Sequence, residues 1–196
     1  MRLYQAEGII AKNINSHYAK GKRTDQWIKT KNYRSFPAFL TGWNRQNDYV
    51  DLSIYSNEEV IPCGKVKHGF AEEEKETLVK FIKNNGQKTN NHWKIEPSVC
   101  MQINCLDWGD GELREPVFDR FRFDLKPEDC TLEQLKLGLA QIPEEIEVTK
   151  PDKHFYPSVT KQDYVMYMRT IAPFILPRLK NKRLTTIRFP DGVEEK

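Results

Sequence analysis

The chain has 196 residues, of which 38% are hydrophobic and 30% charged, enough for one full domain with parts of its neighbours. The aromatic content of 11% argues against intrinsic disorder. The longest apolar stretch, at residues 171–176, contains Pro173 and is too short to span a membrane, and no apolar signal segment follows Met1. We therefore expect a cytoplasmic protein with no membrane partner.

The net charge of +3 is unevenly distributed along the chain. Residues 1–50 carry +6, residues 51–149 carry −8 and residues 150–196 carry +5. A basic segment suits a polyanionic partner such as nucleic acid or a nucleotide. The alternative is that these charges form an ordinary solvated surface.

The first segment predicts two short strands, at residues 8–11 and 27–31, joined by a polar loop. The period of two in a strand places Trp27, Lys29 and Lys31 on one face of the second strand. A basic strand face is therefore expected near the start of the chain.

The middle of the chain predicts five short strands and one helix. We expect strands at residues 36–43, 49–55, 60–66, 99–106 and 113–118, a helix at 71–84 and a turn at 109–111. Pro37 indicates that the first of these strands is bent or lies at a sheet edge. Alternation places Val50, Leu52 and Ile54 on one face of the second. Five strands with a helix after the third is the pattern of an OB-fold barrel.

The four cysteines, Cys63, Cys100, Cys105 and Cys130, form no C-x-x-C pair. Two of them lie in an apolar run, where a free cysteine behaves as a small hydrophobic residue. Reduced thiols in the core are therefore expected, rather than disulfides or a zinc site.

The last segment begins with residues 143–153, which are typical of a linker. A helix is expected to start after Thr160, because Asp163 completes a capping-box variant. The apolar face of this helix is wide and aromatic, and comprises Tyr164, Val165, Tyr167, Met168, Ile171 and Phe174 or Ile175. About 20 residues remain to cover it, so we expect the chain to be a fragment whose partner domain lies elsewhere.

The string EGIIAK at residues 7–12 and the string WIKTK at residues 27–31 together indicate nucleotidyl transfer. A carboxylate at a strand end can hold a divalent metal beside a triphosphate. Two lysines on one strand face can neutralise charge at the transferred phosphoryl group. Each string alone is common and fits an exposed strand face. Their combination, before a five-strand pattern, is much more specific.

These two strings resemble motifs IV and V of the covalent nucleotidyltransferases, which include the ATP-dependent DNA ligases and capping enzymes. Residues 1–140 as a whole resemble the bacterial DNA ligase D family of non-homologous end joining. The further matching strings are KGKR at 20–23, DQ at 25–26, GKV at 64–66, HGF at 68–70, EPSVC at 96–100 and LREP at 113–116 with Phe118. Strings in the last segment resemble the opening of the ligase D polymerase domain, and comprise TKPDK at 149–153, YP at 156–157, VTK at 159–161, APFILP at 172–177 and RFPDG at 188–192.

The resemblance implies a mainly β chain with some α structure, divided into four parts. Residues 1–31 would end a ligase adenylation domain, and residues 32–142 would form the five-stranded OB-fold domain. Residues 143–153 would be a linker. Residues 154–196 would begin a primase-like α/β polymerase domain.

The resemblance also implies roles for residues in the first two strings. Glu7 would hold the metal or the nucleotide, and Lys12 would contact the nucleotide. Lys29 and Lys31 would be the catalytic lysines that bind the α-phosphate. ATP and Mg²⁺ would be the cofactors of the intact enzyme.

The family's motif VI, R-x-D-K, maps onto residues 122–125, where Leu125 stands in place of the lysine and Lys126 follows it. If this segment is a strand, a one-residue shift places the side chain on the opposite face. Whether Lys126 replaces the motif VI lysine is open.

DNA ends or nicks, and a Ku-like end-binding protein, are the partners that the resemblance implies for a nucleoid-associated protein. The expected DNA contacts in the first loop are Lys20, Lys22 and Arg23. Arg114, Arg122 and Lys126 are further candidate contacts. The competing view places the binding surface on the barrel, at Arg114, Arg120 and Arg122.

The family's nucleophile is a lysine in a K-x-D-G-x-R motif, which this sequence lacks. Two residues before the Asp-Gly pairs at 110–111 and 191–192 stand Trp108 and Phe189. Without that lysine no enzyme adenylate can form. We expect part of an ATP-dependent DNA ligase that seals breaks by adenylate transfer to a 5′-phosphate. The alternatives are a catalytically inactive OB-fold fragment that binds DNA, and an inert remnant.

Overall fold

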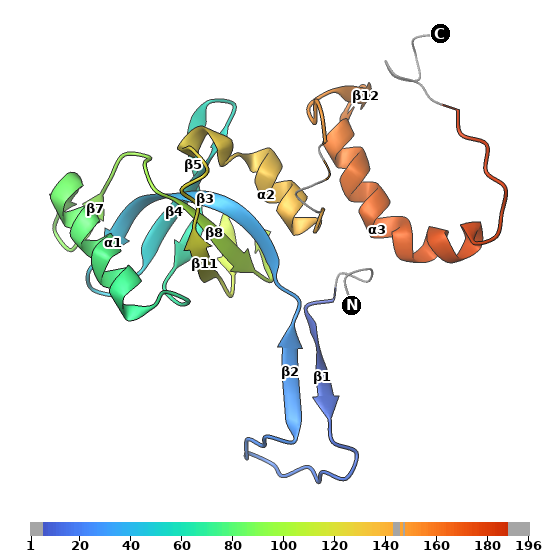
Figure 1. The fold of residues 1–196 in the computed structure, drawn as a ribbon, viewed down its shortest axis with the longest axis horizontal. Helices are drawn as coiled ribbons and strands as arrows, with labels where there is room; N and C mark the ends of the chain where they lie inside the picture. The colour runs from blue at the N-terminus through green and yellow to red at the C-terminus, as the bar shows by residue number, and fades with distance from the viewer. Residues whose placement is uncertain (1–5, 143–145, 147, 188–196) are drawn as a thin grey trace. The chain divides into compact units, whose positions relative to one another are not determined.

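The computed structural model describes residues 6–142, 146 and 148–187, and divides the chain into two units. One unit comprises residues 34–153, and the other comprises residues 1–33 and 154–196. The string at 188–192 and residues 143–145 and 147 of the expected linker lie outside the described residues. The fold is mainly β with few helices, as predicted (Figure 1).

The larger unit is built on one antiparallel sheet, whose main path runs β11–β8–β3–β4–β5. A short hairpin of β6 and β7 joins this sheet where β7 pairs with β3. The strands are β3 (Arg34–Asn44), β4 (Val50–Ser56), β5 (Glu59–Val66), β6 (Gln87–Thr89), β7 (His92–Lys94), β8 (Cys100–Cys105) and β11 (Val117–Phe121). The expected strands at 36–43, 49–55, 60–66 and 99–106 are confirmed as β3, β4, β5 and β8.

The two ends of this strand path approach each other. An isolated parallel bridge joins His68, just after β5, to Val117 in β11, and the amide of Phe118 donates to the carbonyl of His68 at 2.8 Å. Gly69 allows this approach, because its φ is +103° and a Cβ there would collide with the carbonyl oxygen of Phe118. The sheet therefore curls until its ends touch, without a continuous ladder between them.

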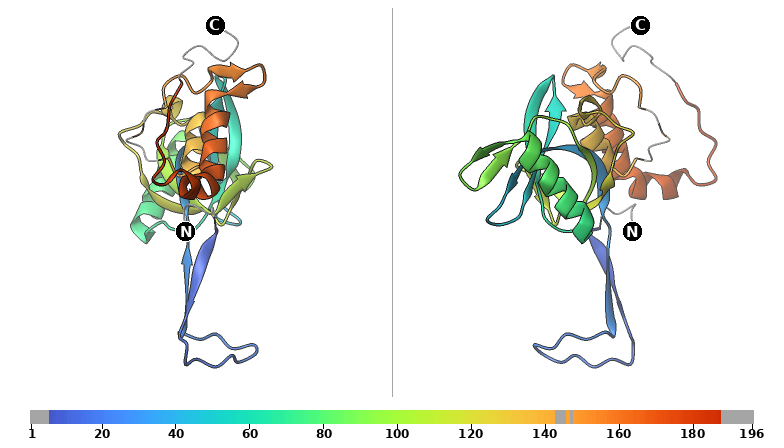
Figure 2. Two further views of the ribbon diagram at one scale, coloured as in Figure 1. Left: turned by 90° about the vertical axis from the view of Figure 1, so that its right-hand side faces the viewer. Right: turned by 60° about the vertical axis from the view of Figure 1, so that its left-hand side comes forward.

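A single large apolar cluster fills the inside of this curled sheet. Its largest fully buried side chains include Phe36, Leu40, Leu52, Ile54, Met101 and Ile103. The predicted burial of Val50, Leu52 and Ile54 is confirmed. Helix α1 (Glu72–Asn85) adds Leu78 and Ile82 to the cluster, and α2 (Leu132–Leu139) adds Leu135. Figure 2 shows α1, in green, beside the strands of the larger unit.

Helix α1 begins one residue later than expected. Ala71 is its N-cap, and the Glu74 carboxylate accepts the Ala71 amide at 2.8 Å. The acidic side chains of the first turn interact favourably with the positive end of the helix dipole. The amide of Gly86 bonds the carbonyl of Ile82 at 2.8 Å and ends the helix.

The expected fifth strand at 113–118 is wrong. Strand β10 (Glu112–Arg114) instead pairs with β9 (Asp107–Gly109) around the predicted turn at 109–111. Glu115 then adopts a left-handed backbone with φ +50° before Pro116, so the chain turns a corner. The strand that completes the sheet, β11, starts only after that corner.

The expectation for Pro37 is partly wrong, because β3 is the central strand of the sheet. Pro37 pairs with Gln102 of β8, whereas pairing with β4 begins only at Phe39. The proline therefore occupies the half of the strand that has one neighbour, where its missing N–H costs no ladder bond to a second strand.

All four cysteines are buried and free, as predicted. Burial raises the pKa of Cys105 to about 12. Burial also raises the pKa of Cys63. Cys100 and Cys130 pack with Phe39 in a second, smaller cluster. These thiols are part of the apolar core.

The other unit contains two separate pieces. The predicted pair of strands is confirmed as the hairpin of β1 (Gly8–Lys12) and β2 (Trp27–Lys31). The second piece is a small hairpin of β12 (His154–Tyr156) and β13 (Val159–Thr160), followed by α3 (Lys161–Leu179).

The predicted capping box of α3 is confirmed. The Asp163 amide donates to the Thr160 hydroxyl at 3.1 Å, and the Asp163 carboxylate accepts the Thr160 amide at 3.0 Å. The helix continues through Pro173 and Pro177. Within the part of the chain that the structure describes, no helix is long and apolar enough to cross a membrane.

Candidate functional site

The β1–β2 hairpin carries the residues of the two motif-like strings. Its antiparallel register sets Lys12 opposite Trp27, Ile10 opposite Lys29 and Gly8 opposite Lys31. Residues directly opposite in such a pair share one face. The predicted common face of Trp27, Lys29 and Lys31 is therefore confirmed, and Lys12 joins it. We call Lys12, Lys29 and Lys31 the lysine face.

Aromatic rings position two of these three lysines. The Lys12 ammonium lies 4.0 Å from the centre of the Trp27 ring, within cation–π range. The Lys31 ammonium lies 3.2 Å from the Tyr33 hydroxyl oxygen and 5.6 Å from the centre of that ring. Lys29 lies between them in sequence and is exposed. The lysine face is thus a row of cations partly ordered by rings.

Glu7 lies at the base of the hairpin, at the end where Lys31 is paired. Its carbonyl accepts the backbone amide of Asn32 at 2.8 Å, next to the Gly8–Lys31 pair. Asn32 is buried, and its side-chain amide donates to the carbonyl of Ala6 at 2.9 Å. The backbone of Glu7 is therefore fixed at the base of the hairpin, next to Gly8.

Gly8 is required by the close approach of the two strands. A Cβ at this position would collide with the carbonyl oxygen of Thr30 and would lie 3.1 Å from the Cα of Lys31. The glycine in the string EGIIAK therefore allows the register that pairs Gly8 with Lys31.

The candidate metal donor at this end of the hairpin is the Glu7 carboxylate. Mg²⁺ is usually held by one or two carboxylates together with substrate phosphates. Glu7 supplies one carboxylate. Among the described residues, no group of three or more His, Cys, Asp or Glu is arranged to hold a metal ion.

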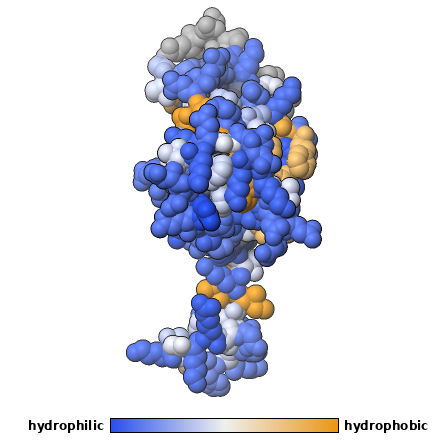
Figure 3. All heavy atoms as spheres, turned by 90° about the vertical axis from the view of Figure 1, so that its left-hand side faces the viewer, coloured by the Kyte–Doolittle hydropathy of each residue, from blue (hydrophilic) through white to orange (hydrophobic). Residues whose placement is uncertain are grey.

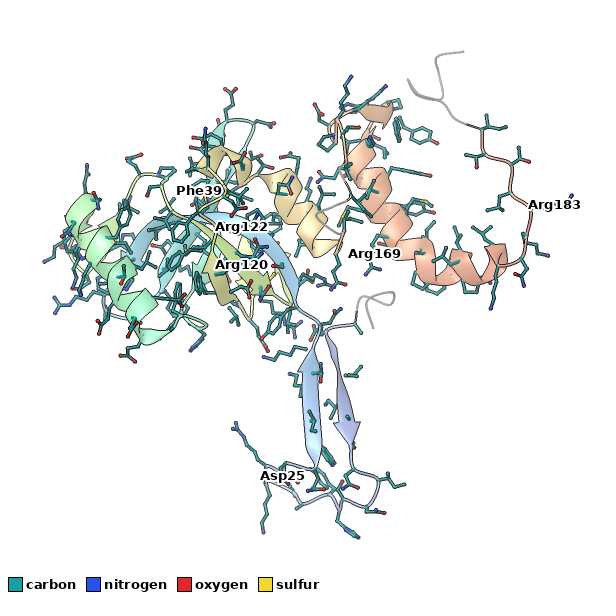
Figure 4. All side chains as sticks on the ribbon, viewed as in Figure 1. Asp25, Phe39, Arg120, Arg122, Arg169 and Arg183 are labelled. Atoms are coloured by element: carbon teal, nitrogen blue, oxygen red, sulfur yellow. The ribbon has the colours of Figure 1, made fainter. Side chains whose placement is uncertain are left out.

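The three cations predicted to contact DNA lie in the loop at the opposite end of the hairpin. Lys20, Lys22 and Arg23 are exposed there, around a turn in which the Lys22 amide donates to the carbonyl of Ala19 at 3.2 Å. Gly21 takes a left-handed φ of +74° in this turn. Figure 4 shows the loop, with Asp25 labelled. The structure separates these cations from Glu7 by the length of the strands.

Arg122, predicted as a DNA contact on the larger unit, is engaged within the protein. Its guanidinium forms two charged hydrogen bonds to Asp124, with Nε at 2.9 Å and Nη2 at 2.8 Å, and Nη1 donates to Gln102 at 2.6 Å. The hydrogen bonds from Arg122 lower the pKa of Asp124 to about 2. Arg120 pairs in turn with Asp119 at 2.6 Å (Figure 4).

The segment that maps onto motif VI is a turn, not a strand. The Leu125 amide donates to the carbonyl of Arg122 at 3.3 Å, so strand alternation does not decide where Lys126 lies. Leu125 packs against the cluster of Phe39, Cys100 and Cys130, which explains an apolar residue at this position. Lys126 is exposed at the start of a 3₁₀ helix, Pro127–Asp129.

One charged group was missed by sequence reasoning. Asp51 on β4 bonds His92 on β7 through its Oδ2, and its Oδ1 lies 3.6 Å from the Lys65 ammonium on β5. The group lines a groove of about 1180 Å³ that also includes Asp110 and Glu112. No sequence signal links residues 51 and 92, because only the β6–β7 hairpin brings them together. The mixed charges of this groove favour no polyanion.

The chain is similar to one end-joining protein along nearly its whole length and to others over about two thirds of it. It is 32% identical over 192 residues to the bifunctional non-homologous end joining protein LigD of Bacillus subtilis, covering 96% of this chain and 31% of that protein. It is 24% identical over 147 residues to the multifunctional non-homologous end joining DNA repair protein LigD of Mycobacterium tuberculosis, covering 65% of this chain and 19% of that protein. No protein-family model matches the chain.

Two solved structures also match part of the chain. The ligase domain of M. tuberculosis LigD is 21% identical with a TM-score of 0.47, over 64% of this chain and 47% of that one. A mycobacterial DNA ligase D complexed with ATP and MES is 22% identical with a TM-score of 0.45, over 64% of this chain and 46% of that one. The chain spans about a third of the B. subtilis protein. By its sequence, this chain is a homologue of part of the bacterial LigD end-joining proteins.

Proposed function

We propose that this chain is part of an ATP-dependent DNA ligase that seals DNA breaks in non-homologous end joining. The observation that carries the proposal is the hairpin register, which aligns Lys12, Lys29 and Lys31 on one face, while the Glu7 backbone is paired with Asn32 at the base of the hairpin. The two strings that form this arrangement are the ones that resemble ligase motifs IV and V. The LigD relatives are named as non-homologous end joining proteins, which supports a role in the same process.

In this proposal the lysine face binds the nucleotide. Lys29 and Lys31 contact the α-phosphate and stabilise the negative charge that develops as the adenylate passes to a 5′-phosphate. Lys12, held against Trp27, contacts the nucleotide. Glu7 contacts the nucleotide or holds Mg²⁺, which neutralises phosphate charge when bound.

We further propose that residues 32–142 form an OB-fold domain. The strand path and the position of α1 after the third strand support this, and so does the parallel contact between His68 and Val117 at the two ends of the path. The boundaries of the larger unit, 34 and 153, lie close to the proposed domain boundaries. Residues 1–31 would then end an adenylation domain.

Residues 154–196 would begin a primase-like polymerase domain, after a linker at 143–153. The capped helix α3 supports this, because its aromatic face is exposed in the described part of the chain. Tyr167 is 58% exposed and Phe174 is 63% exposed. A helix with such a face gains stability when a neighbouring element covers it.

DNA ends or nicks, and a Ku-like end-binding protein, are the proposed partners. Lys20, Lys22 and Arg23 are the proposed phosphate contacts, with Arg114 and Lys126 as further candidates. Arg122 is the weakest of the proposed contacts, because its hydrogen bonds to Asp124 and Gln102 would compete with phosphate.

A second candidate function is DNA binding without chemistry. It is favoured by one observation, the absence of a K-x-D-G-x-R nucleophile motif from all 196 residues. The chain alone, incubated with labelled ATP and Mg²⁺, should therefore form no covalent adenylate. A lysine-linked adenylate on a denaturing gel would contradict both candidates in their present form.

A chimeric protein tests the ligase proposal directly. This chain would replace its 192 aligned residues in B. subtilis LigD, and sealing of a nicked duplex would be measured. We expect sealing by the chimera and a loss of about 100-fold or more in Lys29→Ala or Lys31→Ala, as for other groups that stabilise developing charge. Lys94→Ala, on an exposed lysine of β7, is the matched control and should seal normally. Sealing that is unchanged in Lys29→Ala and Lys31→Ala would refute the assigned roles.

A further inference from the structure

The loop between β1 and β2, residues 13–26, is braced at its base by polar contacts. The Asn13 amide donates to the carbonyl of Gln26 at 2.9 Å, and their side chains bond each other at 2.7 Å. The indole N–H of Trp27 donates to the hydroxyl of Ser16 at 3.0 Å. A loop of 14 residues would otherwise have many conformations, so these contacts give its first turn a defined position.

Tyr18 offers an open aromatic ring on this braced base. Its ring lies 6.0 Å from the centre of the Trp27 ring, with 28° between the two planes, in a stacked arrangement. The tyrosine is nevertheless 75% exposed, so only part of its ring is used by Trp27. Exposed aromatic rings on a rigid support provide stacking surfaces for nucleic acid bases.

The surroundings of Tyr18 are positively charged. Lys20, Lys22 and Arg23 follow it within five residues, and Asp25 is the only acidic residue in the loop. The Lys12 ammonium lies against Trp27 on the same base. On the face drawn in Figure 3 the end of the hairpin is mostly hydrophilic, although Ile14 of the loop is 92% exposed. Apolar atoms gather on the strands, where Ile9, Ile10 and Ile28 are exposed.

We propose that the end of the β1–β2 hairpin binds single-stranded DNA, with a base stacked on Tyr18 and phosphates on Lys20, Lys22 and Arg23. Basic side chains alone attract duplex and single strands alike, because both present phosphates. A ring that is free to stack selects unpaired bases, since the bases of a duplex are already stacked on each other. The ligand is therefore an unpaired strand, such as the overhang at a broken end.

This inference extends the proposed DNA contact at Lys20, Lys22 and Arg23, but it does not depend on ligase chemistry. Loss of nick sealing in the chimera would leave it intact, because the test below measures binding by this chain alone. Conversely, failure of the binding test would leave the roles of Lys29 and Lys31 unchanged.

The test compares an unpaired probe with a paired one. Fluorescence anisotropy would measure binding of this chain to a labelled oligothymidylate of about 20 nucleotides and to a duplex of the same length. Tyr18→Ala should weaken binding to the oligothymidylate by about 10-fold and change duplex binding by less than about 2-fold. Tyr18→Phe, which keeps the ring, should bind both probes like the parent.

Two controls separate stacking from folding and from charge. Tyr167→Ala removes a tyrosine of similar exposure on α3 and should change neither affinity. Replacing Lys20, Lys22 and Arg23 together by Ala should weaken binding to both probes. A parent-like affinity of Tyr18→Ala for oligothymidylate would overturn the proposal, and so would an equal loss for both probes.

A crosslinking experiment adds a readout that does not depend on a variant. An oligothymidylate that carries 5-iodouracil forms a covalent bond on irradiation with an aromatic side chain stacked on that base. We expect the crosslinked peptide to contain Tyr18. Crosslinks confined to peptides of residues 34–142 would place the strand on the larger unit and overturn the proposal.

Discussion

The two units of this chain differ in what they do with their apolar side chains. The sheet of residues 34–153 buries Phe36, Ile54 and Met101 completely. The β1–β2 hairpin and α3 instead expose Ile28 by 63% and Phe174 by 63%. The difference indicates that the larger unit has its own core, whereas the flanking elements gain stability only when another surface covers them.

The residues that stabilise the fold and the residues proposed to bind nucleotide and DNA also lie in different units. The lysine face and the cations around Gly21 lie on the hairpin, which has no core of its own among the described residues. The buried Cys63 and Cys105 belong to the larger unit. Substitutions in the larger unit should therefore change folding, and substitutions in the hairpin should change binding.

The largest expected effect contrasts two phenylalanines. Phe36→Ala removes a fully buried ring from the sheet and should lower the free energy of unfolding by about 3–5 kcal/mol. Phe174→Ala, on the exposed face of α3, should change it by less than about 0.5 kcal/mol. Urea unfolding followed by tryptophan fluorescence measures both. Equal losses in the two variants would show that α3 belongs to the same core.

A second contrast uses two glycines of the larger unit. A Cβ on Gly138 of α2 would collide with the carbonyl of Ser35 and lie 2.9 Å from the Cβ of Phe36. We expect Gly138→Ala to cost about 1–3 kcal/mol of unfolding free energy, despite the better helix propensity of alanine. Gly109→Ala meets no atom within 4 Å and should cost less than about 0.5 kcal/mol. A neutral Gly138→Ala in urea unfolding would contradict the tight packing of α2 on β3.

A third prediction concerns alkaline pH. The unfolded chain ionises Cys105 near its ordinary pKa of 9.0, whereas burial raises the folded pKa to about 12. The stability that this thiol contributes is therefore complete below pH 9 and is lost as the pH rises towards 12. The loss should approach 1.4 kcal/mol per pH unit.

Substitution of Cys105 tests that slope. Cys105→Ala should show a shallower decline of unfolding free energy between pH 9 and pH 12 than the parent does. Val66→Ala leaves a similar cavity without a titrating group, and should keep the slope of the parent. If Cys105→Ala and the parent decline in parallel, the thiol is not protected by burial.

The fourth prediction has the smallest effect on stability and concerns salt. With about 3–5 phosphate contacts, log K for DNA should fall against log salt with a slope of roughly −3 to −4. Replacing Lys20, Lys22 and Arg23 by Ala should flatten the slope by about 2–3 units, with no change in unfolding free energy.

The matched control is a variant of the larger unit, Arg114, Arg120 and Lys126 to Ala, which removes the further candidate contacts and should flatten the salt slope by less than the loop variant does. Arg122 is kept in this control, because its loss would leave Asp124 and Gln102 without their guanidinium partner. Loss of binding only in this control variant would move the DNA surface to the larger unit.

Much of the sheet could be predicted because its residues obey a local pattern. The alternation of Val50, Leu52 and Ile54 sets the buried face of β4. The capping pair of Thr160 and Asp163 sets the start of α3. These signals lie within a few residues of each other, so a single sequence carries them.

The strand and helix predictions failed where the backbone turns a corner within an apolar segment, and where the sequence pattern is weak. The apolar residues Leu113 and Phe118 suggested one strand, but the left-handed backbone of Glu115 divides that segment between β10 and β11. The hairpin of β6 and β7 was not predicted, because it is short and polar. Helix α2 was not predicted either. Its signal was nevertheless present, because the Thr131 side chain caps a helix with leucines at 132, 135 and 139.

Only the part of the candidate site that lies on the β1–β2 hairpin could be predicted from the sequence. The shared face of Trp27, Lys29 and Lys31 follows from the period of a strand, and the register with Lys12 follows from local pairing. The Asp51–His92 contact joins residues 41 positions apart, and the Arg122–Gln102 contact joins residues 20 apart. Contacts of that kind depend on the fold of the sheet, which local patterns do not specify.

Amide hydrogen exchange of the whole chain tests the contrast between the two units most directly. We expect amides in β3, β4 and β8 to exchange only through global unfolding, because these strands enclose the core. Amides of the β1–β2 hairpin and of α3 should exchange orders of magnitude faster, since their apolar faces are exposed. Exchange in α3 and the hairpin as slow as in β3, measured on the monomer, would contradict the account.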